Sequence, residues 1–247
     1  MDVLAADDAL LSALSRGETH ALDDDLSWID ARGRLLGKAD LIARKPKPLL
    51  ESGERDVHTY GPLVTVRVEH GLHHVLRILV QRADGWRLIV WHEVAQDGPA
   101  VPHGAGRREY DNPCFTLPYA PRNADERDCL ASWQELERAV MGHDPDEWAR
   151  HVADEFVVVG AARRHTKRDR YEVIAEQRRN DTPSAPAPLV SARLDAFADA
   201  MLMRCEHQPF YGKANRVSRV FVRRNGLWQM AVSFQTTQTD VPVVTIP

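Results

Sequence analysis

The side chains best suited to acid–base chemistry in this sequence are histidines and tyrosines on segments that alternate like β-strands. A neutral imidazole can take up a proton near neutral pH, and a tyrosine hydroxyl can polarise a neighbouring group. If Trp86 faces the core, the period of two points His92 inward and Trp91 outward. His92 could then act as a base beside Tyr60. The ligand-binding candidates are Trp28, His58, Tyr60, His74, His92, Trp133, Tyr171 and His207.

These residues also have a plainer interpretation. Polar side chains near strand ends are often hydrogen-bonded parts of the structure, and perturbed groups of this kind are not always functional. Trp133 lies in the apolar stripe of an expected helix, where a tryptophan is more often core than ligand contact. Because the spacing is unspecific, the structural interpretation is the stronger one for each residue alone.

No metal site is expected. His70, His73 and His74 lie around Gly71 at an expected turn, where alternate residues face opposite sides of a sheet. Three imidazoles in this arrangement would not converge on one ion. The cysteines are odd in number and lack metal-type spacing, which favours buried thiols in a reducing compartment; they are Cys114, Cys129 and Cys205.

The sequence also lacks the motifs of several enzyme classes. It has no G-x-S-x-G motif, no glycine loop that would cradle phosphate, and no pair of acids with convincing spacing. A nucleotide-dependent mechanism and a serine hydrolase mechanism are therefore not expected, and no cofactor is expected either.

Composition limits the partners. The chain has 247 residues, 43% hydrophobic and 28% charged, with a net charge of −4. That charge gives no reason to expect nucleic acid or an anionic membrane as a partner. No apolar run approaches the roughly 18 residues that span a bilayer. The acidic N-terminal segment is typical of a helix rather than a signal peptide, so a cytoplasmic location is expected.

Residues 216–237 predict a long β-hairpin. Asn225-Gly226 suits a two-residue type I′ turn, because both central positions of that turn need φ > 0. The strand after the turn has a strict period of two, which puts its apolar residues on one face. These residues are Trp228, Met230, Val232 and Phe234.

A weaker copy of this hairpin lies in the first half. Residues 77–94 have Asp84-Gly85 where the later hairpin has its Asn-Gly pair. Each hairpin closes one half of the chain, which indicates a duplication. The domains are expected at 1–96 and 124–240, joined by a Pro/Gly-rich linker at 97–123.

The element order repeats with the hairpins. Each half is expected to contain two helices, a strand, a helix and a four-stranded antiparallel meander, which is an α+β class. In the first half the strands are expected at 26–29, 57–60, 63–69, 75–82 and 86–94, with helices at 3–16, 19–22 and 38–43. In the second half the strands are expected at 156–159, 189–197, 200–207, 216–224 and 227–236, with helices ending at Gly142 and starting after Asp144 and Thr166.

This order resembles the NTF2-like superfamily, and within it the SnoaL-like or DUF4440-type domains. The second half carries the closer match, in VMGHDPDEWARHVADEFVVVG, TKRDRYEVIAE and RVFVRRNGLWQMAVSFQT. The first half departs from the pattern, because Asp84-Gly85-Trp86 lacks the residue between Gly and Trp. The resemblance implies two cone-shaped domains, each with helices packed on a curved antiparallel sheet around a pocket.

The resemblance also implies alternative functions. Enzymes of this superfamily use a buried carboxylate or histidine, with Tyr or a protonated Asp as hydrogen-bond donor. The first hypothesis is therefore a protein that binds a small apolar molecule, or a cofactor-independent isomerase, dehydratase or cyclase that transfers protons on an apolar carbonyl substrate. Divergence between the halves predicts that one pocket remains functional.

The second hypothesis is a non-catalytic interaction module. In it the two halves pair through their sheets as an intramolecular pseudo-dimer, and a further pairing into a homodimer stays open. The outward-facing residues of the two hairpins would form the contact; these are Arg87, Ile89, Trp91, Leu227, Gln229 and Ala231.

Overall fold

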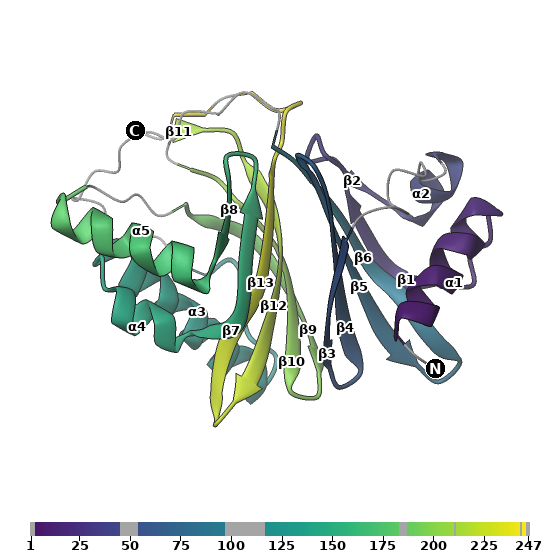
Figure 1. Ribbon diagram of the computed structural model, residues 1–247, viewed down its shortest axis with the longest axis horizontal. Helices are drawn as coiled ribbons and strands as arrows, with labels where there is room; N and C mark the ends of the chain where they lie inside the picture. The colour runs from purple at the N-terminus through teal and green to yellow at the C-terminus, as the bar shows by residue number, and fades with distance from the viewer. Residues whose placement is uncertain are drawn as a thin grey trace.

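The chain folds into four layers, with one sheet from each half in the middle and helices on the two outer sides (Figure 1). The computed structural model describes residues 3–44, 54–96, 117–182, 187–209, 211–242 and 244–245. Residues 97–116 of the expected linker lie outside the described residues, so the domain limits at 96 and 124 stay predictions.

The first half begins with a helix and continues into a six-stranded sheet. Its elements are α1 (Val3–Ser15), β1 (Leu22–Ile29), β2 (Leu35–Leu36), α2 (Lys38–Arg44), β3 (Glu54–Tyr60), β4 (Leu63–His70), β5 (His73–Arg82) and β6 (Gly85–Ala95). The strand order is β2-β1-β6-β5-β4-β3. The short helix expected at 19–22 is wrong. The Leu22 N–H donates to the Thr19 carbonyl at 3.0 Å, which closes a single turn before β1 begins.

The second half repeats this arrangement. Its elements are α3 (Ala124–Met141), α4 (Pro145–Arg150), β7 (Val152–Gly160), β8 (Arg163–Thr166), α5 (Lys167–Arg179), β9 (Leu189–Phe197), β10 (Ala200–His207), β12 (Asn215–Arg224) and β13 (Leu227–Thr237). The strand order β8-β7-β13-β12-β10-β9 matches the first sheet position by position. A small pair, β11 (Tyr211–Gly212) with β14 (Val244–Thr245), stands apart.

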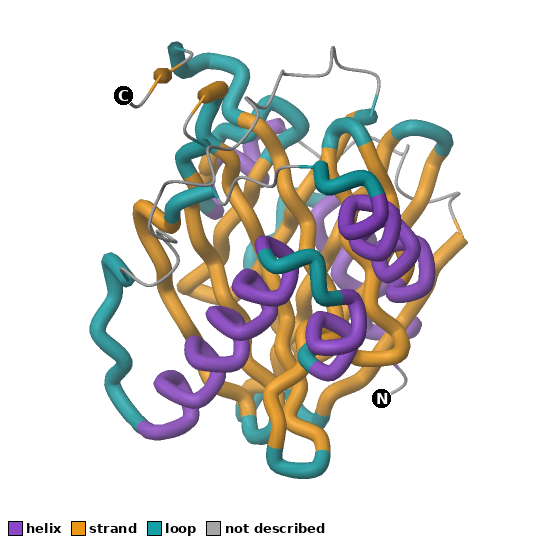
Figure 2. Tube along the Cα trace, turned by 90° about the vertical axis from the view of Figure 1, so that its left-hand side faces the viewer, coloured by secondary structure: helices purple, strands orange, loops and turns teal. Residues whose placement is uncertain are grey.

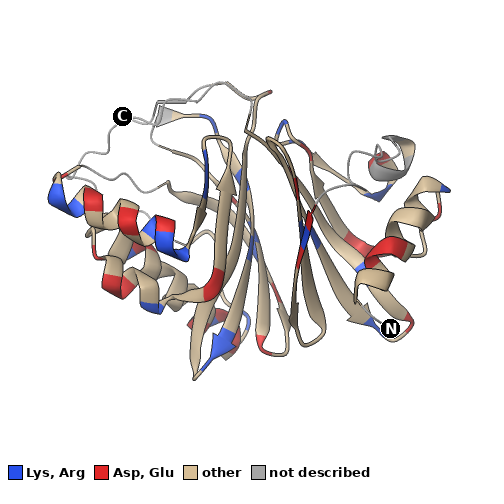
Figure 3. Ribbon diagram, in the orientation of Figure 1, with Lys and Arg blue, Asp and Glu red and all other residues tan. Residues whose placement is uncertain are grey.

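Two α+β domains with one topology confirm the expected fold class. The sheets are mixed rather than purely antiparallel, because the first strand of each half pairs in parallel with the last: β1 with β6, and β7 with β13. Helices α3, α4 and α5 cover the outer face of the second sheet, as Figure 2 shows. Charged residues are frequent on the outer helices, whereas the strands of the two sheets carry fewer (Figure 3).

A lysine contact occurs at equivalent places in both halves. Lys38 Nζ lies 3.2 Å from the Leu22 carbonyl oxygen and 3.2 Å from Asp24 Oδ1. Lys167 Nζ lies 2.8 Å from the Val152 carbonyl oxygen and 3.0 Å from Asp154 Oδ1. Each lysine therefore ties the start of a helix to the start of the first strand of its half.

The turn of the second hairpin is as expected. Asn225 and Gly226 both have positive φ, 52° and 79°. Arg224 pairs with Leu227 across the turn, so the loop has two residues.

The turn of the first hairpin is shifted by one residue from the expected position. Arg82 pairs with Gly85, so the two loop residues are Ala83 and Asp84, and Gly85 already belongs to β6. Trp86 is consequently the counterpart of Trp228. The first half therefore lacks no residue between Gly and Trp. The apparent gap arose because Asp84-Gly85, rather than Ala83-Asp84, was matched to the Asn-Gly turn.

A β-bulge in each hairpin changes which face its side chains occupy. In β13 the partners are Phe221 with Met230 and Val220 with Val232, so Ala231 is an extra residue. The expectation that Trp228, Met230, Val232 and Phe234 share one face is wrong. An extra residue moves every later side chain to the opposite face. The residues before the bulge face the helices and those after it face the other sheet.

The same bulge occurs in β6. Leu79 pairs with Leu88 and Ile78 with Val90, which leaves Ile89 as the extra residue. The expected phase of this strand is therefore wrong as well. Trp91 lies in the core of its own domain, whereas His92 faces the second sheet.

The faces of the two sheets that turn away from the helices pack on each other. Their apolar core includes Leu76, Ile78 and Val90 from the first sheet and Leu202 and Val232 from the second. Full burial of one such side chain is worth roughly 1.5–3 kcal/mol. Exposed ion pairs at the edges contribute about 0–1 kcal/mol each, so apolar packing dominates the contact.

His92 is the polar centre of this contact. The Thr236 hydroxyl donates to the Glu93 carbonyl at 2.6 Å and therefore accepts from His92 Nε2–H at 3.1 Å. The Ser218 hydroxyl then donates to Nδ1 at 2.9 Å. Complete burial lowers the pKa of His92 to about 3, so this imidazole is neutral.

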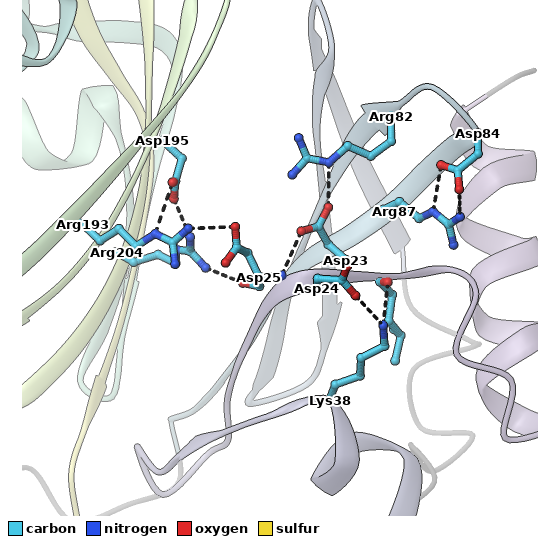
Figure 4. A network of polar contacts seen from close by, with 11 residues as sticks. Asp23, Asp24, Asp25, Lys38, Arg82, Asp84, Arg87, Arg193, Asp195 and Arg204 are labelled. Carbon is cyan, nitrogen blue, oxygen red and sulfur yellow. Dashed lines mark hydrogen bonds and ion pairs between the residues drawn. The ribbon is translucent and has the colours of Figure 1, made fainter. Parts of the chain in front are cut away.

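Polar contacts also bridge the two halves at the edge of the interface. Arg193 pairs with Asp25 at 2.9 Å, and Arg204 Nη1 donates to the Asp25 carbonyl at 2.7 Å (Figure 4). Elsewhere the Tyr60 hydroxyl donates to Glu155 Oε1 at 3.1 Å. Burial and this carboxylate raise the pKa of Tyr60.

At Gly33 the backbones of the two halves lie against each other. This glycine has φ +73°, and a Cβ built there would lie 2.7 Å from the Thr237 carbonyl oxygen. The Arg216 guanidinium donates to the Gly33 carbonyl at 2.8 Å. Within the described ranges, no helix is long and apolar enough to cross a lipid bilayer.

The contact at Gly33 predicts the effect of a single methyl group. A positive φ costs a non-glycine residue about 1–2 kcal/mol. Gly61 has φ +61° with nothing within 4 Å of its Cβ position, so Gly61→Ala should show only that cost. Gly33→Ala adds an overlap with backbone, and we expect it to lose at least about 1 kcal/mol more in urea unfolding. Equal losses in the two variants would contradict this apposition of the halves.

His92 predicts sensitivity to acid. The free imidazole has a pKa of 6.5 and the folded one about 3, so below pH 6.5 the unfolded chain binds a proton that the folded chain does not. The folded state therefore loses stability as the pH falls from 6.5, by on the order of 2 kcal/mol at pH 5. We expect His92→Gln, which keeps a donor and an acceptor, to remove that loss. The exposed His20→Gln serves as the control, and urea unfolding at pH 7 and pH 5 measures both.

Candidate functional site

A cavity of about 190 Å³ lies in the second domain, between the helices and the face of the sheet that they cover. Its apolar wall includes Leu136, Val140, Trp148, Phe156 and Met230. Its polar residues are Glu137, Arg163, Arg170, His207, Asn215, Arg219, Ser233 and Gln235. It combines an apolar body with a few converging polar groups, as small-molecule sites do.

Arg219 is the innermost cation of this cavity. It sits in the middle of β12, and only 4% of it is exposed. Its Nη1 donates to His207 Nε2 at 2.9 Å and to Cys205 Sγ at 3.0 Å, while its Nε has no hydrogen-bond partner. Among the contacts of the described residues, no carboxylate bonds to this guanidinium. A buried charge without a counter-ion is costly and calls for an explanation.

His207 is held neutral with its proton on Nδ1. That nitrogen donates to the Ala187 carbonyl at 2.8 Å, which leaves Nε2 as the acceptor for Arg219. Burial, and next the charge of Arg219, lower the pKa of His207 to about 3. Burial also raises the pKa of Cys205, so its thiol is not a ready nucleophile. Neither side chain is poised to take a proton from a ligand.

Two further arginines lie on the cavity wall. Arg163 comes from β8 and Arg170 from the first turn of α5. Desolvation lowers the pKa of both, to about 10 for Arg170, where the charge of Arg163 adds to the effect. Arg170 is half-buried, whereas Arg163 is exposed. Glu137 of α3 acts in the opposite direction on each. It is the one carboxylate among the described lining residues.

The equivalent place in the first domain is occupied by the chain itself. Arg77 is the counterpart of Arg219, and Asp7 of α1 pairs with it at 2.7 Å and 2.5 Å. Both side chains are fully buried, and the guanidinium lies 5.6 Å from the centre of the Trp91 ring. Leu10 and Leu14 of the same helix belong to the surrounding core.

The sequence candidates of the first domain do not meet in one place. Trp28 belongs to the helix-side core and donates from Nε1 to Glu93 Oε1 at 2.8 Å. His58 lies on β3, 2.8 Å from Asp56, with its ring stacked on Tyr60. His74 is buried with neither ring nitrogen hydrogen-bonded.

In the second domain the candidates are closer to the cavity. His207 lines it, and the buried Trp133 ring lies 6.1 Å from that of His207, with an indole N–H that has no partner. Tyr171 lies outside it, where its hydroxyl donates to Asp146 at 2.7 Å.

Sequence reasoning missed the arginines. Arg163, Arg170 and Arg219 are not among the ligand-binding candidates that the sequence suggests. A signal existed, because Arg77 and Arg219 each interrupt the apolar part of a long strand at matching positions of the two hairpins. An arginine in such a strand needs a buried partner or a ligand.

No family model and no curated protein matches the sequence. Solved structures resemble about half of the chain. An NTF2-like protein from Cytophaga hutchinsonii is 11% identical, with a TM-score of 0.41, over 47% of this chain and 99% of that one. A suggested dehydratase of the NTF2-like family from Streptomyces avermitilis is 14% identical, with a TM-score of 0.40, over 46% and 95%.

ActVI-ORFA from Streptomyces coelicolor is 14% identical, with a TM-score of 0.39, over 46% of this chain and 98% of that one. The two halves of this chain share one topology with each other. Each has the helices, the parallel closing strand and the four-stranded meander in the same order. Fold alone does not assign an activity, and identities this low add nothing to it.

The two matched arginines predict opposite effects on stability. Arg77→Met leaves Asp7 buried with only a 3.4 Å contact to Arg55, and should cost about 3–5 kcal/mol. Arg219→Met removes a charge that no acid compensates, and should change the free energy of unfolding by less than about 1 kcal/mol. Urea unfolding of both variants measures this. An equal loss in Arg219→Met would mean that Arg219 has a structural role.

Proposed function

We propose that the second domain binds a small molecule in its cavity, and that the first domain supports it without a site of its own. The observation that carries this proposal is the buried guanidinium of Arg219, which faces the cavity without an acidic partner among the described residues. A group that lowers stability persists when it serves binding. The apolar wall around it supplies contact area for the body of a ligand.

The contrast between the domains supports a single site. In the first domain Asp7 fills the place opposite Arg77 and balances its charge. In the second domain Glu137 of α3 acts on Arg163 and Arg170. No acid of the described chain is bonded to Arg219. A ligand is therefore proposed to take the place that Asp7 has in the first domain.

Catalysis by proton transfer stays a prediction. An isomerase, dehydratase or cyclase needs a base beside the reacting carbon, and His207 already uses both of its nitrogens. Glu137 is the group that could take this role. Proton transfer would be supported if the protein turned over a cavity ligand and Glu137→Gln abolished that turnover while the ligand still bound.

The interaction-module alternative concerns the sheet–sheet contact. Packing of Ile89, Val90, Ala231 and Val232 between the halves favours an intramolecular pseudo-dimer. We propose that this pairing makes one chain the complete assembly. It is compatible with a ligand in the cavity, because the two features lie on opposite faces of the second sheet.

Native mass spectrometry of gently purified protein tests the proposed function. We expect a single chain of 27.9 kDa with an additional small mass that is lost on denaturation. Arg219→Met should reduce the occupied fraction, while Arg168→Met, at an arginine of α5 that is 87% exposed in its side chain, serves as the matched variant with an intact cavity. A bare mass for the unaltered protein, together with no binding from a small-molecule library, would refute the proposal.

A further inference from the structure

We propose that the ligand of the second-domain cavity is a small carboxylate with an apolar body, whose carboxylate is bound by Arg219. This inference rests on the proposed function and names the class of ligand. It follows from the charge of the cavity, its unsatisfied hydrogen-bond donor, and its size.

The charge of the cavity is opposite to that of the whole protein. The chain carries a net charge of −4, yet the cavity wall holds Arg163, Arg170 and Arg219 against the single acid Glu137. A hollow lined by one sign of charge concentrates ligands of the other sign. Burial disfavours the charged form of the Arg170 guanidinium, and an anion bound beside it would favour that form again.

The unsatisfied group on the cavity wall is a donor. Arg219 Nε has no acceptor among the described residues. His207 cannot serve Arg219 further, because its Nε2 already accepts from Nη1. A carboxylate offers two acceptor oxygens and fits the planar fork of a guanidinium.

The first domain shows how this chain satisfies the same arginine. Arg77 is bound through Nε and Nη2 by the two carboxylate oxygens of Asp7. Arg219 stands at the matching position of the duplicated hairpin with its Nε free. The missing partner therefore has the chemistry of the group that is present in the other half.

Size and wall chemistry limit the rest of the ligand. An engineered apolar cavity of about 150 Å³ holds benzene with its six non-hydrogen atoms, so in proportion the cavity of about 190 Å³ has room for about eight. The apolar walls from Leu136, Trp148, Phe156 and Met230 favour an aryl or short alkyl body. A benzoate-sized molecule meets both limits, whereas a steroid-sized one does not.

Three nearly isosteric probes test the inference on the intact protein. Benzoate, benzamide and benzamidinium have the same number of non-hydrogen atoms and differ in charge, and hexanoate with hexanamide provides an alkyl pair. Isothermal titration and NMR line broadening measure their binding. We expect each carboxylate to bind about tenfold or more tightly than its amide, and benzamidinium not to bind.

Variants assign the carboxylate to its partner. Arg219→Met and Arg170→Met should each weaken benzoate about tenfold while changing benzamide little. Arg168→Met is the matched control, because Arg168 lies on the same helix as Arg170 but is 87% exposed in its side chain and pairs with Glu172. Should Arg219→Met fail to fold, Arg170→Met still tests the charge of the cavity.

The outcomes separate the two proposals. If the amides bind as tightly as the acids, the ligand is not an anion, and small-molecule binding stands while this inference is wrong. Failure of both benzoate and hexanoate to bind also overturns the inference. If the purified protein additionally shows no bound small mass and no compound of the small-molecule library binds, the proposed function falls with it.

Discussion

The burial of both faces of the central hairpins is the constraint on which the rest of this structure depends. Strands β5, β6, β12 and β13 each have one face against helices and the other against the opposite sheet. Burying a strand on both faces requires apolar residues on both, which a simple alternation does not provide. The bulges at Ile89 and Ala231 meet this requirement, because they change the phase of each strand part-way along it.

The sheet–sheet contact leaves the helix-side faces as the places where the domains could diverge. The first domain closes this face with α1, whose Asp7 neutralises Arg77. The second covers it with three helices that leave a cavity around Arg219. The two halves therefore carry matched arginines in matched frameworks, and the helices decide whether the charge is balanced within the described chain.

Stability and binding make opposite demands on such a position. Removing one partner of a buried ion pair strongly lowers the stability of the folded protein, because the other charge is left buried without a partner. A buried charge that has no partner already imposes this cost on the folded state. The first domain satisfies the demand of stability, and the second retains the penalty at Arg219. A ligand that supplies the missing negative charge would stabilise the folded state in proportion to its occupancy.

The sequence by itself determined the local features of this protein. Hydrophobic period, turn residues and caps located the long strands and the five helices, including β9 and β10 at their observed limits, but not the short strands β2, β8, β11 and β14. They also indicated the duplication, because those signals depend on residues close together in the chain.

What the sequence did not determine is the phase after Ile89 and Ala231, since an extra residue is recognised only by its partner across the sheet. The site also depended on tertiary structure. A strand arginine such as Arg219 looks the same in sequence whether a distant helix supplies its acid or leaves the place to a ligand.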